Sequence, residues 1–187
     1  MKNNLAQYSD KELVAMLRGD RKQSEAAFSE IYDRYSLKIN AYCMTILGNR
    51  ELAEDIFQDC FVRFYHHARS NWGSGSIVGF LITIARNLCL NAKRDRKSTV
   101  PIEELELPVM AESSFEDKEV SDLIIMGLDL LEHDFKEALI LRYFDDLRYK
   151  DIGDILGITE ARARYLVFTG KQKLKAIMQP YLKGVYK

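Results

Sequence analysis

The sequence predicts an all-α protein made of two small helical domains joined by an acidic, flexible linker. Apolar residues recur every three or four positions over most of the 187 residues, which is the spacing of amphipathic helices. No convincing run of alternating β-type residues appears, and a count of only 3 Pro and 10 Gly argues against a β-sandwich or barrel. With 47% hydrophobic residues, the chain can bury a real core in one domain or two.

The first domain is expected to span residues 1–97 as a four-helix unit. Ser9 followed by Glu12 has the spacing of a capping box and predicts a short helix that ends near Gly19. Gly48 is expected to end the helix that follows. The three longer helices are predicted at residues 24–47, 51–68 and 77–95, with a Gly/Ser loop at 69–76. The residues of the fourth helix expected in the core are Phe80, Leu81, Ile84 and Leu88.

The linker is predicted at residues 98–120, where helical periodicity is lost and two of the three prolines lie. Residues 98–122 carry eight acidic residues and one Lys. On either side, residues 86–97 carry five basic residues against one acidic, and residues 159–187 carry seven against one. The net charge of -1 therefore conceals two basic patches, which are the distribution expected of a nucleic-acid-binding protein.

The second domain, residues 121–187, ends in a pattern of two helices joined by a tight turn. Gly157 can adopt the left-handed conformation that ends a helix, and Thr159 is a good N-cap for the next one. This is the helix-turn-helix pattern of a DNA reader. Its second helix should bury Ala163, Leu166, Val167, Gly170 and Leu174, which leaves cations and aromatic side chains outward. Alternatively, the outward residues are solvated surface, or the aromatic ones pack on a neighbouring segment.

Several other functions lack support in the sequence. The N-terminus has no hydrophobic signal core and no apolar run approaches a membrane span, so we expect a cytoplasmic protein without membrane insertion. Cys43, Cys60 and Cys89 show no CxxC spacing and are expected to be buried free thiols. No catalytic constellation or phosphate-binding loop appears. We therefore expect no catalytic residue, cofactor or metal, and no enzymatic activity.

Three stretches together carry a resemblance to a known family. They are AEDIFQDCFVRFY at 53–65, GFLITIARNLCLNAKRDRK at 79–97, and the stretch from ALILRYFDDLRYKDIGDILGI onward at 138–174. The chain resembles bacterial RNA polymerase sigma factors of the extracytoplasmic-function (ECF) group of the sigma-70 family, which have only sigma regions 2 and 4. The resemblance implies a subunit that binds core polymerase and directs promoter-specific initiation. The partners it implies are core RNA polymerase, through the β' clamp helices and β flap, promoter DNA, and an anti-sigma factor.

The resemblance also implies roles for individual residues of the first domain. The residues implied to bind core polymerase form a polar stripe on the third helix: Asp55, Gln58 and Asp59. Taken by itself, such a stripe would be an ordinary solvated face. Capture of the melted -10 element falls on the fourth helix and the preceding loop: Trp72, Arg86, Asn87, Asn91, Lys93 and Arg94. Trp72 could instead fill the core of its own domain.

In the second domain, the resemblance implies that the last helix enters the major groove of the -35 element. The residues implied are Arg162, Arg164, Tyr165, Phe168, Thr169 and Lys171. Relatives often have Arg, Arg and Ala at Leu166, Thr169 and Gly170, and many have His at Phe168. Fewer cations predict weak duplex affinity and an unusual promoter preference.

Two rival functions remain open at this point. A stand-alone helix-turn-helix regulator would use the C-terminal domain alone and leave the AEDIFQD and IARN stretches unexplained. A helical interaction adaptor would use the basic faces to bind an acidic protein instead of DNA.

Overall fold

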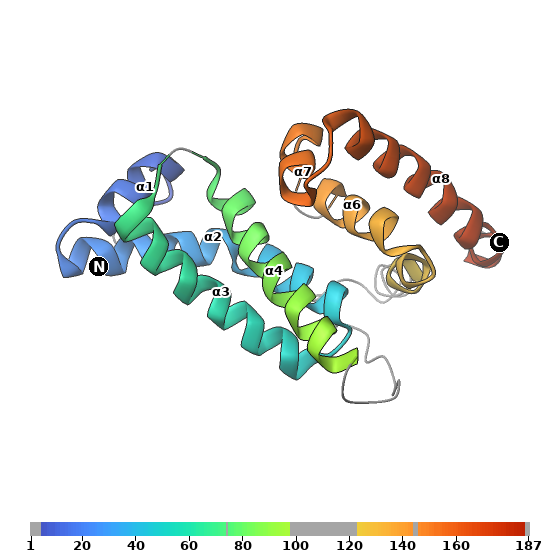
Figure 1. Cartoon of the computed structure of the whole chain (residues 1–187), viewed down its shortest axis with the longest axis horizontal. Helices are drawn as coiled ribbons and strands as arrows, with labels where there is room; N and C mark the ends of the chain where they lie inside the picture. Colours follow the sequence, from blue (N-terminus) through green and yellow to red (C-terminus); the bar gives the residue numbers. More distant parts are fainter. Residues whose placement is uncertain (1–4, 74, 98–122, 144–145, 186–187) are drawn as a thin grey trace. The chain divides into compact units, whose positions relative to one another are not determined.

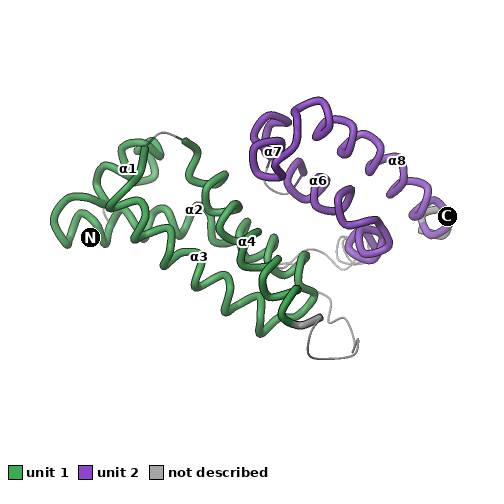
Figure 2. Tube along the Cα trace, viewed as in Figure 1, with its two compact units in different colours: residues 1–104 green, residues 105–187 purple. Residues whose placement is uncertain are grey.

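The computed structural model describes residues 5–73, 75–97, 123–143 and 146–185, and the regular structure within these ranges is helical (Figure 1). It forms two compact units, residues 1–104 and 105–187 (Figure 2). The all-α prediction is confirmed. The linker predicted at 98–120 lies outside the described residues. The helices are α1 (Asp10–Leu17), α2 (Arg21–Leu47), α3 (Arg50–Asn71), α4 (Ile77–Lys97), α6 (His133–Tyr143), α7 (Tyr149–Leu156) and α8 (Glu160–Val185), and residues 123–129 are also helical.

Local hydrogen bonds determine where the first helices begin and end. The Ser9 backbone N–H donates to Glu12 at 2.7 Å, and the Glu12 N–H donates to the Ser9 hydroxyl at 3.4 Å, which confirms the capping box. Asp20 accepts from the Gln23 N–H at 2.9 Å, so α2 begins three residues earlier than predicted. Gly48 ends α2 with a left-handed φ of 62°, as expected.

The core of the first unit lies where α2, α3 and α4 pack together, with α1 against α2 and α3. Tyr42 of α2 and Phe64 of α3 are its largest fully buried side chains. Burial in the core raises the pKa of the Cys60 thiol to about 12, and its Sγ donates to the Leu81 carbonyl at 3.2 Å. Cys43 and Cys89 are buried as well, as the sequence predicted. At neutral pH the Cys60 thiol is therefore protonated and unreactive.

The buried stripe of α4 differs from the prediction. Leu81 is buried as expected, but Phe80, Ile84 and Leu88 are only half-buried. α4 packs against both α2 and α3, and the contact with two helices centres the buried arc one position further along. The fully buried residues of α4 are Ile77, Leu81, Ile82, Ala85 and Cys89.

The second unit holds α8 against α6 and α7, and two glycines permit the close contact. A Cβ at Gly170 would lie 3.3 Å from side-chain atoms of Leu139 and Phe135 on α6. A Cβ at Gly153 of α7 would lie 2.8 Å from the carbonyl oxygen of Ile158, in the turn before α8. Any larger side chain at Gly153 would therefore push the turn away from α7.

The turn itself follows the predicted pattern. Gly157 ends α7 with a left-handed φ of 69°, and the Ile158 N–H donates to the Gly153 carbonyl at 2.9 Å. Thr159 caps α8, since its hydroxyl accepts from the Arg162 N–H at 3.2 Å. α7 and α8 are thus joined by three residues, and the first two of them, Gly157 and Ile158, both donate their N–H groups to the Gly153 carbonyl.

We predict that Gly153→Ala destabilises the C-terminal unit by about 1–3 kcal/mol, because the new methyl group overlaps a backbone oxygen that cannot rotate away. The measurement is urea unfolding of the full chain followed by far-UV circular dichroism. Fluorescence of Trp72, the only tryptophan, reports on the N-terminal unit in the same samples. Asp154→Ala, an exposed neighbour on α7, should change stability by less than about 0.5 kcal/mol. Equal midpoints for the two variants would contradict the prediction.

Candidate nucleic-acid interface

One face of α8 is buried and the opposite face presents cations and aromatic rings. Ala163, Leu166, Val167 and Gly170 are buried, as the sequence predicted, and Leu174 is half-buried. On the outward side, Phe168 is 66% exposed and Tyr165 is 49% exposed. Thr169 is half-buried at the edge of this face. Tyr165 also lies near the Phe135 ring, with ring centres 6.5 Å apart, so Phe168 is the more exposed of the two candidate contact residues.

The cations of α8 lie over aromatic rings. The guanidinium of Arg162 lies 4.9 Å from the centre of the Tyr165 ring, and the Lys171 ammonium lies 5.8 Å from that of Tyr143. Arg164 lies 5.0 Å from the ring of Tyr149. These rings orient the cations, and the edges of an Arg or Lys head group remain available to donate hydrogen bonds.

A polar stripe runs along α3. Asp55 and Gln58 are exposed, whereas Asp59 is half-buried and forms an ion pair with Arg63 at 2.9 Å. Val62, 53% exposed, continues the same face one turn further on. Val62 was not among the residues predicted for this surface. The signal was present, since this apolar residue stands outside the spacing of the buried residues of α3: Ala53, Ile56, Cys60, Phe61, Phe64 and Ala68.

The -10 candidates on α4 divide between two adjacent stripes. Asn87, Asn91 and Arg94, at spacings of four and three, are exposed. Arg86 and Lys93 are seven residues apart on a second stripe and are half-buried. The arrangement combines amides, which can read base edges, with cations, which can contact phosphates.

Trp72 lies at the C-terminal end of α3 and packs against the aromatic side chains of its own unit. Its ring is 5.8 Å from Phe64 and 5.3 Å from Phe80, edge-on to both. Arg18 donates to the Trp72 carbonyl at 2.8 Å. Phe80 also stacks on His67, with ring centres 4.5 Å apart. The indole is half-buried, so only part of its surface is available to a nucleic-acid base.

Comparison with known families identifies both units. Residues 31–99 match the family model for Sigma-70 region 2, and residues 122–174 match that for Sigma-70, region 4. The chain belongs to the ECF group of the sigma-70 family. The ECF RNA polymerase sigma factor SigM of Bacillus subtilis is 28% identical over 160 residues, which cover 83% of this chain and 96% of SigM. SigW of the same organism is 27% identical over 169 residues, covering 83% and 90%.

Two solved structures share the fold of this chain. RpoE from Bartonella quintana, solved in complex with the anti-sigma factor NepR, superposes with a TM-score of 0.70 at 20% identity, covering 81% of this chain and 96% of RpoE. CnrH, solved with the cytosolic domain of CnrY, gives 0.68 at 16% identity, covering 91% and 97%.

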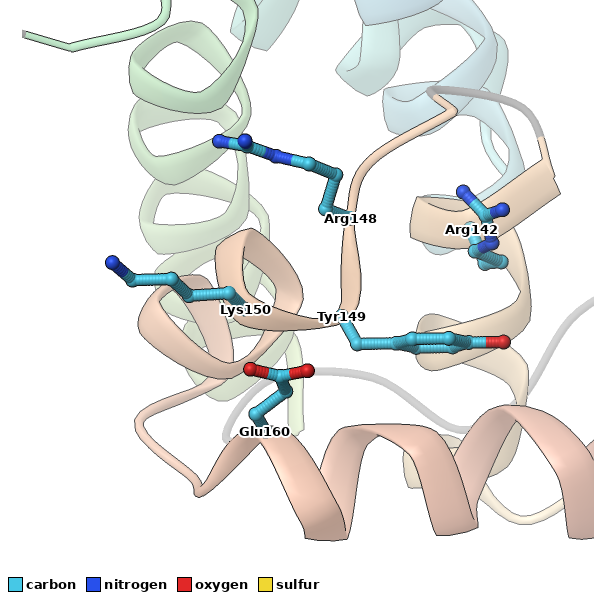
Figure 3. Close-up of a pocket in the computed structure, with 5 residues that line it drawn as sticks. All are labelled: Arg142, Arg148, Tyr149, Lys150 and Glu160. Carbon is cyan, nitrogen blue, oxygen red and sulfur yellow. The ribbon is translucent and has the colours of Figure 1, made fainter.

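The structure of this sigma factor adds residues that the sequence analysis did not assign to a site. A hollow of about 270 Å³ lies at the meeting point of α6, α7 and α8 and is lined by Arg142, Arg148, Tyr149, Lys150 and Glu160. The Tyr149 ring points toward Arg142, whereas Arg148 and Lys150 point to the opposite side (Figure 3). In the sequence, the only indication of this hollow is the group of cations around the start of α7. The fold is what brings these cations together with Glu160.

Two further properties of the sigma factor concern the described residues only. None of the helices they form has the length and apolar character that crossing a membrane requires. Within the same residues, no group of three or more His, Cys, Asp or Glu side chains is placed to hold a metal ion.

Arg148 controls the ionisation of Asp151 at the start of α7. Its guanidinium donates to the two carboxylate oxygens at 2.8 and 3.1 Å, and these hydrogen bonds lower the pKa of Asp151. The pKa of Asp151 is lower in the folded protein than in the unfolded chain, so its ion pair with Arg148 stabilises the fold at pH values above the unfolded pKa. This stabilisation is lost as the pH falls through the pKa that Asp151 has in the folded protein.

We predict that Arg148→Gln raises the pKa of Asp151 toward its ordinary value. The measurement is a carboxyl titration by NMR. The difference in stability between wild type and variant should be present at neutral pH and disappear in acid. Lys175→Gln, on the exposed side of α8, should leave the titration of Asp151 unchanged. An unshifted Asp151 in Arg148→Gln would contradict this assignment.

Proposed function

We propose that this sigma factor binds core RNA polymerase, delivers it to a -35 duplex through the C-terminal unit, and captures the melted -10 strand through the N-terminal unit. It acts as a transcription initiation factor in the cytoplasm and catalyses no reaction itself. The observation that carries the proposal is that both sigma-70 regions match on one chain. Each region also presents an exposed surface whose chemistry suits its role.

The outward face of α8 suits the major groove of the -35 element. Phe168 and Tyr165 can contact thymine methyl groups or sugars, while Arg164 and Lys171 supply charge for phosphates or base acceptors. Arg162 and Thr169 lie at the margins of the same face. Leu166 and Gly170 are buried, so neither can contact DNA directly. Relatives often carry Arg and Ala at these two positions.

The exposed side of α4 suits single-stranded DNA better than a duplex groove. Asn87 and Asn91 offer amides to the edges of unpaired bases, and Arg86, Lys93 and Arg94 supply charge for the backbone. Trp72 can stack on a base only through the part of the indole that Phe64 and Phe80 leave uncovered.

The α3 stripe supplies the surface for core polymerase. Asp55 and Gln58 are exposed on α3, and Asp59 is oriented by Arg63. By family resemblance, the partner is the pair of β' clamp helices, and the C-terminal unit contacts the β flap. Val62 adds an apolar contact one turn beyond these polar residues, and a mixture of polar and apolar contacts is usual in a protein interface.

Joining the two units on one chain compensates for weak individual contacts. The domains are 1–97 for region 2 and 121–187 for region 4, with the acidic stretch 98–120 between them. Once the first unit is docked on polymerase, the second is held at high effective concentration near the upstream duplex. In the free protein we propose that an anti-sigma factor covers these surfaces. RpoE and CnrH, which share the fold, were solved with such a partner or with the cytosolic domain of another protein.

We predict that the chain, added to sigma-free bacterial core polymerase, produces new start sites in run-off transcription from a genomic fragment library. Asp55→Arg should reduce those transcripts at least about tenfold, because it reverses a charge within the proposed docking surface for core polymerase. Asp33→Arg makes the same charge reversal at an exposed position of α2 and should leave transcription near the wild-type level.

The same assay separates the rival functions. DNA binding without new starts would favour a stand-alone helix-turn-helix regulator. Neither DNA binding nor starts would favour a helical adaptor that binds an acidic protein. The two matched sigma-70 regions do not favour either rival.

We predict that two neighbouring α8 residues contribute differently to the affinity of the polymerase complex for its promoter duplex. Lys171→Gln should lower the slope of log affinity against log salt by about 1, because one phosphate contact is lost. Phe168→Ala should weaken binding by about 1–3 kcal/mol while leaving that slope unchanged, because an apolar contact releases no counterion.

Fluorescence anisotropy at a series of salt concentrations measures both quantities. Lys22→Gln, on the exposed start of α2, removes the same charge from the other unit and should alter neither. Equal salt slopes for Lys171→Gln and wild type would show that Lys171 makes no phosphate contact and would contradict the prediction.

A further inference from the structure

The ring of Tyr149 is contacted by two guanidinium groups from different helices. The Cζ of Arg142, at the end of α6, lies 5.4 Å from the ring centre. The Cζ of Arg164, in the second turn of α8, lies 5.0 Å from the same centre. Tyr149 is the first residue of α7, so a single ring links all three helices (Figure 3 shows it with Arg142).

The position of this ring is determined by the fold. α7 is held to the start of α8 by the close contact at Gly153 and by the hydrogen bond from the Ile158 N–H. Tyr149 is half-buried and, like other tyrosines, has only two side-chain torsions that place its ring. The ring is therefore a rigid surface at a fixed distance from the backbone of Arg164.

The two arginines use their donors differently. Arg142 donates to the Asp146 carboxylate at 3.2 Å and to the Leu147 carbonyl at 3.0 Å. Asp146 has a positive φ of 52°, so Arg142 holds an unusual backbone conformation in place. Arg142 is thus committed to the chain segment that leads into α7.

Arg164 is the member of the pair that can contact another molecule. Its side chain is 63% exposed, and its one hydrogen bond among the described residues goes to Glu160 at 3.0 Å. A guanidinium has five N–H donors, so several remain for a ligand. The Glu160 carboxylate and the Tyr149 ring restrain this guanidinium from two directions, on the outward face of α8.

We propose that Tyr149 is a positioning residue that holds the Arg164 guanidinium in the orientation in which it contacts the promoter duplex. The inference rests on the proposed function and adds a residue of α7 to the residues that determine duplex affinity. Without the ring, Arg164 must be ordered when DNA binds, which lowers affinity. The ring attracts both guanidinium groups through its quadrupole, so its loss removes one of the two interactions that restrain Arg164.

A double-mutant cycle tests the coupling directly. The full chain, assembled with core polymerase, is titrated against a promoter duplex identified by run-off transcription. The variants are Tyr149→Leu, Arg164→Gln and the combination of the two. Tyr149→Leu should weaken binding about three- to fivefold, the size expected of an exposed cation–π contact. In the Arg164→Gln background the same substitution should have almost no effect, because the side chain that it orients is already gone.

Two controls separate positioning from a structural role. Lys171 lies two turns further along α8 and contacts Tyr143 instead of Tyr149, so Tyr149→Leu and Lys171→Gln should have independent, additive effects. Tyr149→Phe keeps the ring and should retain most of the affinity. Each variant is compared with wild type in thermal unfolding, because damage to the fold would weaken binding equally in every background.

The results of the double-mutant cycle separate failure of the positioning role from failure of the proposed function. If Tyr149→Leu weakens binding equally in the wild-type and Arg164→Gln backgrounds, the positioning role is wrong while the proposed function stands. If Arg164→Gln binds as well as wild type, the inference is overturned through its contact residue. If the wild-type complex binds no duplex, the proposed function and the inference both fail.

Discussion

The close contact of α8 with α6 and α7 is the constraint on which the rest of the C-terminal unit depends. At Gly153 there is no room for a larger side chain, and at Gly170 a Cβ would already lie 3.3 Å from side chains of α6, so these two glycines let α8 lie close against its neighbours. Once Leu166 and Val167 are buried in that contact, helical geometry places Phe168 and Lys171 outward. Which residues lie on the outward face of α8 is therefore a consequence of packing on the other side of the same helix.

The N-terminal unit shows the same relation between a buried face and an exposed one. α4 is buried through Leu81, Ala85 and Cys89, which leaves Asn87 and Asn91 exposed. α3 is buried through residues such as Ile56 and Phe64, and its polar stripe lies outward. Because each surface belongs to a helix that also forms the core, a substitution on one face tests function only if the other face remains packed.

The sequence predicted those features that short-range chemistry controls. The capping box at Ser9, the end of α2 at Gly48 and the turn at Gly157 depend on residues within four positions of each other. The buried face of α8 was also predictable, because Ala163, Leu166, Val167 and Gly170 recur at spacings of three and four. The family resemblance supplied the roles of the exposed residues, which no pattern of exposure could have assigned.

Features that depend on contacts between distant segments were missed. The buried stripe of α4 was predicted incorrectly because two helices flank it, a fact that periodicity within α4 does not contain. The roles of Gly153 and Tyr149 were not found because the atoms that contact them come from the turn, α6 and α8. Val62 was overlooked because a single apolar residue on a polar stripe has no period of its own.

The central claim is that one chain contacts two separated promoter elements through two different units. Site-specific photo-crosslinking in the initiation complex tests it most directly, with a photoreactive phenylalanine analogue at position 168 of α8 or at position 87 of α4. We expect crosslinks from position 168 to the upstream duplex and from position 87 to the non-template strand of the melted region. Crosslinks from both positions to the same element, or from neither to DNA in a complex that initiates transcription, would contradict it.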